Sequence, residues 1–169
     1  MRRIRLTING EVRKLEVAET ALLLDVLREQ CGLYSVREVC GIGQCGACTV
    51  LVDGRPLSSC LLLAGLQDGR SVETLEGLSR EGELHPIQQA FLEHEACQCG
   101  YCTPGFILSV KALLEERPDP SEAQVREYLA GNLCRCGAYP EIFKATMAAS
   151  ARLRGEMAAG RGCQGPGGS

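Results

Sequence analysis

The first part of the chain alternates between apolar and polar positions. Apolar residues occupy every second position from Ile4 to Ile8, which predicts a strand with one buried face. Asn9-Gly10 follows, and this pair suits a two-residue hairpin turn because both residues tolerate positive φ. The alternation resumes over residues 12–17, so the pattern predicts a β-hairpin at the start of the chain.

The rest of the N-terminal half adds a helix and three short strands to this hairpin. Apolar residues spaced four apart predict a helix over residues 21–30, with Thr20 as its N-cap. After a loop rich in Gly and Cys, Asp53-Gly54 is the expected turn of a second hairpin. The later strands are predicted over residues 49–52, 55–59 and 72–75.

The pattern becomes helical after about residue 76. Thr103 is the expected cap of one helix, and Ser121 with Gln124 forms the capping box of another. The expected helices begin near Pro86, Pro104, Ser121 and Pro140. We therefore predict an α+β chain whose β-rich half and helical half meet near residues 76–84.

Composition excludes several classes of protein. Lys and Arg number 18 against 21 Asp and Glu, and the resulting net charge of −3 does not suit a nucleic-acid-binding surface. The N-terminus lacks the apolar segment of a secretory signal, and no stretch is apolar enough to span a membrane. We therefore expect a protein of the reducing cytoplasm, where clustered Cys are typically metal ligands.

The chain contains 11 Cys, most of them in short clusters. Cys40-x4-Cys45-x2-Cys48, with Cys60 further on, has the spacing of a plant-type [2Fe–2S] site. Gly residues between these ligands allow the backbone to curl around a small core and to aim N–H groups at sulfur. They are Gly41, Gly43 and Gly46. A zinc site is the alternative, but zinc ribbons prefer two C-x2-C pairs, so the spacing favours the cluster.

Cys99-x2-Cys102 and Cys134-x-Cys136 form a second set, with room for two helices between the pairs. Each pair precedes the predicted start of a helix, where partial positive charge lowers thiol pKa and suits an anionic cluster. A C-x-C half-site is not a ferredoxin signature by spacing alone. The residues therefore favour a [2Fe–2S] cluster and a zinc ion about equally at this second set.

The remaining Cys and His residues suggest no further chemistry. Cys31 is expected to be a small buried apolar residue, Cys97 a bystander of the second set and Cys163 a free thiol in the tail. His85 and His94 are the only His residues, and both are expected on the surface. Since no nucleophile–base pair is evident, we expect no catalytic residues and no substrate site in this chain.

Three motifs, in order along nearly the whole chain, resemble the iron–sulfur subunit of the xanthine oxidase family of molybdenum hydroxylases. The motifs are VCGIGQCGACTVLVDG (39–54), QCGYCTPGF (98–106) and GNLCRCGAY (131–139). This resemblance implies a β-grasp ferredoxin-like domain over residues 1–78 and an all-α four-helix [2Fe–2S]-binding domain over 79–155. Residues 156–169 would form a flexible Gly-rich tail.

The resemblance also implies two [2Fe–2S] clusters and two partners. The first cluster would be held by Cys40, Cys45, Cys48 and Cys60, and the second by Cys99, Cys102, Cys134 and Cys136. The second would lie beside the molybdopterin of a large subunit, contacted by Gln98 and the Cys136 backbone. Electrons would pass from molybdenum through the second and then the first cluster toward FAD in a medium subunit. The implied assembly is a hetero-oligomer such as a dimer of heterotrimers, without nucleic acid or a membrane span.

Two other functions compete with an electron-transfer subunit. A free-standing ferredoxin-like carrier would need only one cluster domain, so the helical half argues against it. A zinc-dependent interaction module would use the same Cys residues but would be colourless. The substrate is outside the reach of this sequence, because the resemblance assigns its binding site to another chain.

Overall fold

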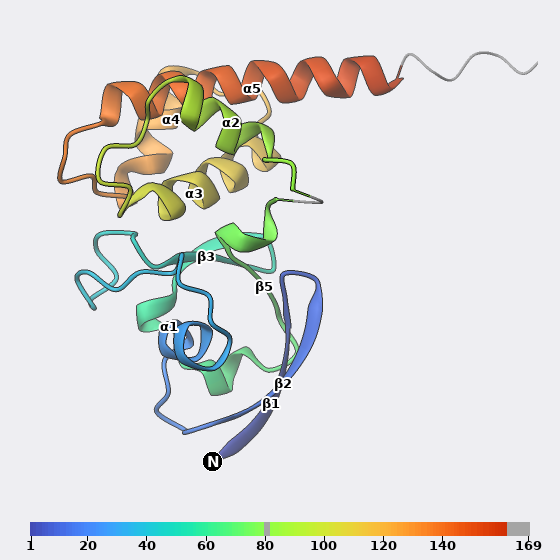
Figure 1. The fold of residues 1–169 in the computed structure, drawn as a ribbon, viewed down its shortest axis with the longest axis vertical. Coiled ribbons are helices and arrows are strands. Elements are labelled where there is room, and N and C mark those ends of the chain that lie inside the picture. The colour runs from blue at the N-terminus through green and yellow to red at the C-terminus, as the bar shows by residue number, and fades with distance from the viewer. Residues whose placement is uncertain (80–81, 162–169) are drawn as a thin grey trace, which may run out of the picture.

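The chain folds into a sheet-containing part and a helical part that lie one above the other (Figure 1). The computed structural model describes residues 1–79 and 82–161, without the side chains of 156–161. The strands are β1 (Arg2–Ile8), β2 (Glu11–Val17), β3 (Thr49–Val52), β4 (Arg55–Ser58) and β5 (Ser71–Glu73). The helices are α1 (Leu23–Asp25), α2 (Pro86–Glu93), α3 (Thr103–Glu116), α4 (Glu122–Tyr128) and α5 (Tyr139–Arg161). The predicted α+β class is confirmed.

The five strands form one mixed sheet in the order β2-β1-β5-β3-β4. β1 pairs in parallel with β5, and the other neighbours are antiparallel. Both predicted hairpin turns are confirmed, because Asn9 and Gly10 have φ of 51° and 85°, and Asp53 and Gly54 have φ of 49° and 77°. Alternate residues of β1 are buried in the sheet core, as predicted. They are Ile4, Leu6 and Ile8.

The first helix differs from its prediction. Only Leu23–Asp25 is α-helical, and a π-helical turn continues it over Val26–Gln30. Thr20 is not its cap, because residues 21–23 are instead paired with residues 62–64. Leu23 N donates to Leu62 O at 2.7 Å, and Ala64 N donates to Ala21 O at 2.8 Å. This pairing with a distant segment delays the start of the helix.

In the helical half, α2 and α4 begin at residues whose side chains cap them. The Ser121–Gln124 capping box is confirmed, with Gln124 N donating to Ser121 Oγ at 3.3 Å. The prediction of Thr103 as a cap is wrong, because the N-cap of α3 is Cys102. His85 caps α2 by accepting from Ile87 N at 3.2 Å. None of the helices described here is long and apolar enough to cross a bilayer.

The C-terminal helix is longer than the sequence pattern indicates. α5 continues to Arg161, beyond residue 155, where the predicted helical domain ends. The remainder of the segment 156–169, including Cys163, lies outside the described residues.

β3 is shared between two hydrophobic cores. Val50 and Val52 belong to the core of the sheet, whereas Leu51 packs with the helices. Successive side chains of a strand point to opposite faces, so one strand serves both cores. α3 covers this outer face of β3. The two halves are thus held together by a continuous packed joint.

This joint gives a prediction for Gly105 on α3. A Cβ added at Gly105 would lie 2.2 Å from the backbone oxygen of Gly46. We expect Gly105→Ala to lower the free energy of unfolding by about 1–3 kcal/mol, since the backbone must shift to admit the methyl group. Urea unfolding of the purified metal-bound chain measures this change.

Gly155→Ala is the matched control. Gly155 lies on α5, and a Cβ there would meet nothing within 4 Å. This substitution should leave stability unchanged or raise it by up to about 1 kcal/mol, as Ala does in a helix. Equal stabilities for the two variants would contradict the close packing of α3 on the loop that contains Gly46.

Candidate metal centres

The first thiol set lies where the sheet meets the helical half. Cys40, Cys45 and Cys48 come from the loop between the first helix and β3, and Cys60 lies in the short 3-10 turn after β4. Cys48 and Cys60 are 2% and 3% exposed and belong to the sheet core, whereas Cys40 and Cys45 are half-buried. The set therefore has an inner pair and an outer pair of thiols.

Contacts between the sulfur atoms follow the same pairs. Cys40 hydrogen-bonds Cys45, and Cys60 hydrogen-bonds Cys48. Cys60 also interacts electrostatically with Cys40 across the set. The structure therefore brings together all four residues that the sequence predicts as ligands of the first centre.

Backbone N–H groups of the loop point at sulfur, as its Gly content predicts. Amides of Ile42, Cys45 and Gln44, in decreasing order of effect, lower the pKa of the Cys40 thiol to about 6. Gln44 N lies 3.4 Å from Cys40 Sγ. Burial is the main cause that raises the pKa of Cys60 to about 11, although the Gly43 amide opposes it. Such N–H groups stabilise a thiolate-bound anionic centre.

The three glycines of this loop adopt the left-handed backbone that the sequence predicts. Gly41, Gly43 and Gly46 have φ of 66°, 72° and 70°. At Gly43 a Cβ would also lie 2.3 Å from a methyl carbon of Leu61. A side chain is therefore opposed here by both backbone strain and lack of space.

The second thiol set lies at two helix starts, as predicted. Cys102 is the N-cap of α3, with Cys99 just before it, and Cys134 and Cys136 precede α5. Cys134 is buried, Cys102 is half-buried, and Cys99 and Cys136 are exposed. This set also consists of an inner pair and an outer pair.

Contacts within the second set again join thiols two by two. Cys99 hydrogen-bonds Cys136, and Cys102 hydrogen-bonds Cys134. Burial, followed by contact with Cys134, raises the pKa of Cys102 to about 12. The Tyr101 amide is the main cause that lowers the pKa of Cys99. In each pair one thiol gives up its proton more easily than the other, as like charges in contact require.

The paired arrangement distinguishes the two metal alternatives. A zinc ion with four thiolate ligands places all of them around a single point. A [2Fe–2S] cluster instead takes two thiolates on each of two irons. The donor atoms of both sets therefore fit a two-iron cluster better than a zinc ion.

The other described Cys residues stay outside these pairs. Cys31 flanks the sheet core, and burial raises the pKa of its thiol. Cys97 is exposed, and its Sγ would lie 3.4 Å from a Cβ at Gly100. Gln98 is exposed beside Cys99.

Two residues near the sets have contacts that the sequence patterns did not single out. Asn132 is buried at 6% exposure and bonds Gly46 in the first loop. Arg37 donates to Gly100 O and lies over the Tyr101 ring, 4.9 Å from its centroid. In the sequence, Asn132 stands out as a polar residue inside a Cys motif. Nothing in the local pattern indicates its distant partner, Gly46.

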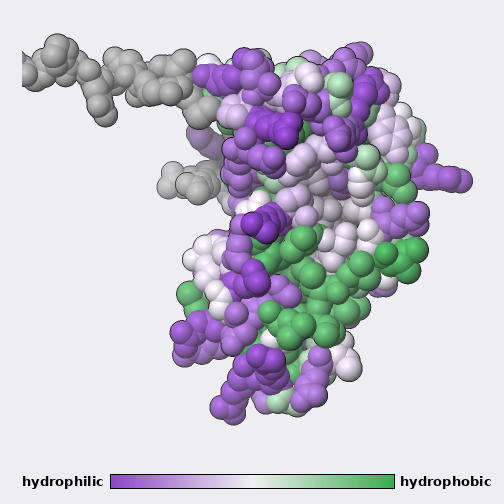
Figure 2. Space-filling model, turned by 180° about the vertical axis from the view of Figure 1, so that it is seen from behind, coloured by the Kyte–Doolittle hydropathy of each residue, from purple (hydrophilic) through white to green (hydrophobic). Residues whose placement is uncertain are grey.

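Apolar side chains gather on the surface of the sheet-containing half, where Figure 2 shows a broad green area. Exposed apolar residues close in sequence to the Cys residues of the first set are Val39, Ile42, Leu57, Leu61 and Leu63. A contiguous apolar surface of this kind is typical of a protein–protein interface.

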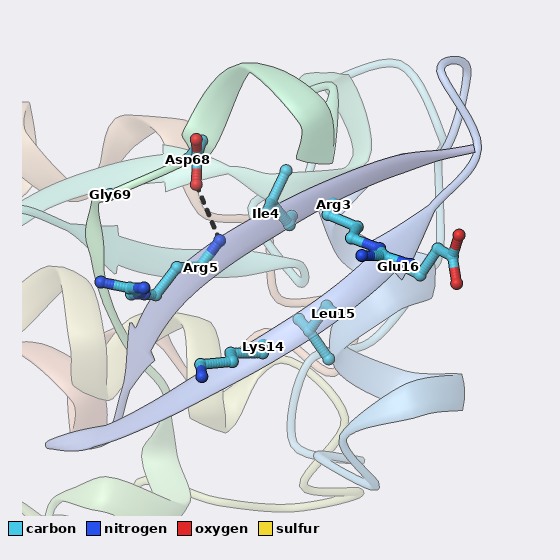
Figure 3. Close-up of a pocket in the computed structure, with 8 residues that line it drawn as sticks. All are labelled: Arg3, Ile4, Arg5, Lys14, Leu15, Glu16, Asp68 and Gly69. Carbon is cyan, nitrogen blue, oxygen red and sulfur yellow. Dashed lines mark hydrogen bonds between the residues drawn. The ribbon is translucent and has the colours of Figure 1, made fainter.

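A hollow of ≈ 610 Å³ beside the β1–β2 hairpin is a separate feature. Its lining is shown in Figure 3, where the backbone N–H of Arg5 donates to the Asp68 carboxylate at 2.7 Å. The lining residues are Arg3, Ile4, Arg5, Lys14, Leu15, Glu16, Asp68 and Gly69. No Cys is among them, so this hollow is distinct from both thiol sets.

Comparison with known proteins identifies both halves. The profile of the 2Fe-2S iron-sulfur cluster binding domain matches residues 6–99, and that of the [2Fe-2S] binding domain matches residues 74–147. The chain is 49% identical over 142 residues to the nicotinate dehydrogenase small FeS subunit of Eubacterium barkeri, covering 84% of this chain and 90% of that one. It is 45% identical over 157 residues to a probable xanthine dehydrogenase subunit of Bacillus subtilis, covering 93% and 88%.

A solved structure has the same fold. The aldehyde oxidoreductase of Desulfovibrio desulfuricans superimposes with a TM-score of 0.89 at 47% sequence identity. The match covers 92% of this chain but only 18% of that longer chain. This chain thus corresponds to one part of that longer polypeptide.

The two thiol sets can be tested separately. We expect Cys134→Ser to remove one of two iron–sulfur EPR signals and about half of the bound iron, since each cluster needs four thiolates. The other signal should persist, because Cys134 belongs to the second set only. EPR of the dithionite-reduced protein and iron analysis measure both effects.

Cys97→Ser is the matched control, because Cys97 lies near the second set without belonging to either of its pairs. It should keep both signals and all of the iron. Loss of a signal in this control, or loss of both signals in Cys134→Ser, would contradict the assignment of two independent sets.

Proposed function

We propose that this chain, which belongs to the [2Fe-2S] subunits of the xanthine oxidase family of molybdenum hydroxylases, carries electrons from a molybdopterin centre in a partner subunit toward FAD. The observation that carries the proposal is the presence of two separate sets of paired thiols on one packed chain. Each cluster, when bound, supplies a group that accepts and releases one electron. The protein supplies the thiolates, the N–H groups that stabilise them and the fixed spacing between the sets.

The proposed ligands divide between two domains. Cys40, Cys45, Cys48 and Cys60 would hold one cluster in residues 1–78, and Cys99, Cys102, Cys134 and Cys136 would hold the other in residues 79–155. Two hydrophobic cores, one under each set, support this division.

The outer pair of the second set is the proposed point of electron entry. Cys99, Cys136 and Gln98 are exposed and come from adjacent loops. We assign the contact with the pterin of the large subunit to the Gln98 side chain and the Cys136 backbone. An exposed amide suits this role because it offers both donors and an acceptor to a polar ring.

Assembly into a larger enzyme is favoured over a free-standing ferredoxin-like carrier. The chain is similar to subunits of multi-subunit dehydrogenases. The apolar side chains around the first set support the same conclusion, because a monomer rarely exposes such a surface. The proposed partners are a large molybdopterin-binding subunit and a medium FAD-binding subunit. The proposed compartment is the cytoplasm, which keeps thiol ligands reduced.

Substitution of the apolar surface tests this proposal. We expect Ile42→Glu, at a residue 65% exposed beside the first set, to weaken association with the partner subunits without loss of either cluster. A charge in the core of an interface costs free energy because it is left without water or a partner. Size-exclusion chromatography of the complex, with EPR of each fraction, measures both effects.

Val12→Glu is the control, at a residue 61% exposed on β2. It should co-purify with the complex as the unsubstituted chain does. A native chain that elutes alone near 18.2 kDa with both clusters would instead support the free-standing carrier.

A further inference from the structure

A single hydrogen bond joins the backbones of the two thiol sets. Leu133 N donates to Cys45 O at 2.9 Å. Cys45 belongs to the outer pair of the first set, and Leu133 directly precedes Cys134 of the second. A path along the backbone from Cys45 to Cys134 through this contact therefore crosses one hydrogen bond and otherwise follows covalent bonds.

The side chain of Asn132 fixes the backbone on both sides of this bond. Its Nδ2 donates to Gly46 O at 3.2 Å, next to Cys45 in the first loop. Its Oδ1 accepts from Ser109 Oγ of α3 at 2.9 Å. Because the residue is buried, both bonds are protected from competition by water.

The groups around this bond are closely packed. A Cβ at Gly46 would lie 2.5 Å from Asn132 Nδ2 and 2.6 Å from Gly131 O. Gly46 O also accepts from Thr49 N at 3.2 Å and from Thr49 Oγ1 at 2.8 Å. Gly46 O is therefore held from the sheet by Thr49 and from the helical half by Asn132.

We infer that Asn132 is a positioning residue for electron transfer between the two thiol sets, because it holds the Leu133–Cys45 hydrogen bond in place. The inference rests on the proposed function. Electron tunnelling weakens steeply with distance and with the loss of bonded contacts along its path. A displacement of one loop from the other would therefore slow the transfer while leaving both ligand sets complete.

Asn132→Ala in the assembled enzyme tests the inference. We expect both EPR signals and the full iron content to remain, since no ligand is changed. The magnetic interaction between the two reduced clusters should decrease, and the electron-transfer step between them should slow severalfold, because both fall as the distance between the clusters grows. Low-temperature EPR and rapid-reaction spectroscopy measure these two quantities.

Two further variants separate positioning from general stability. Asn132→Leu keeps about the size of the side chain but can neither donate to Gly46 O nor accept from Ser109, so it should behave as Asn132→Ala. Asn9→Ala removes a comparable Asn in the β1–β2 turn, whose side chain bonds Thr74 twice, at 3.0 and 2.8 Å. This control should lower stability without changing the magnetic interaction or the transfer rate.

The outcomes are distinct. Unchanged magnetic interaction and transfer rate in Asn132→Ala, with both clusters present, would overturn the inference. If that variant fails to assemble, Ser109→Ala removes only the bond that orients Asn132 and should reduce the interaction to a smaller extent, whereas no reduction would also overturn it. A native enzyme that contains neither iron–sulfur cluster would refute the proposed function itself.

Discussion

The main physical constraint on this chain is that it must place four thiolates around a small anionic core, and must do so at two sites. Like charges in contact repel, so each set needs compensation from N–H dipoles and from burial of its inner pair. The first set obtains it from a loop that glycine residues allow to curl, and the second from loops that precede α3 and α5. The surrounding elements hold these loops in place.

β3 and the buried Asn132 make the two binding regions one unit. β3 contributes side chains to both cores, so neither half can move without disturbing the other. Asn132 adds a polar contact at the point where the two loops meet. Electron transfer between the two sets benefits from this arrangement, because its rate depends on the distance between them and the packing keeps that distance constant.

The sequence predicts the local features of this fold well and the distant ones poorly. The hairpin turns at Asn9-Gly10 and Asp53-Gly54 and the capping box at Ser121 follow from chemistry within a few residues. Cys spacing predicts which four thiols form the first set, and the structure brings these four together. The start of α1 and the role of Asn132 depend on partners far along the chain, at Leu62 and at Gly46. No pattern within a local window contains that information, so these features appear only in three dimensions.

The metal content of the purified, air-protected chain tests the central claim most directly. Two complete [2Fe–2S] clusters require about four irons and four inorganic sulfides per chain. The account predicts this ratio. One or two zinc ions per chain in place of iron and sulfide would contradict it.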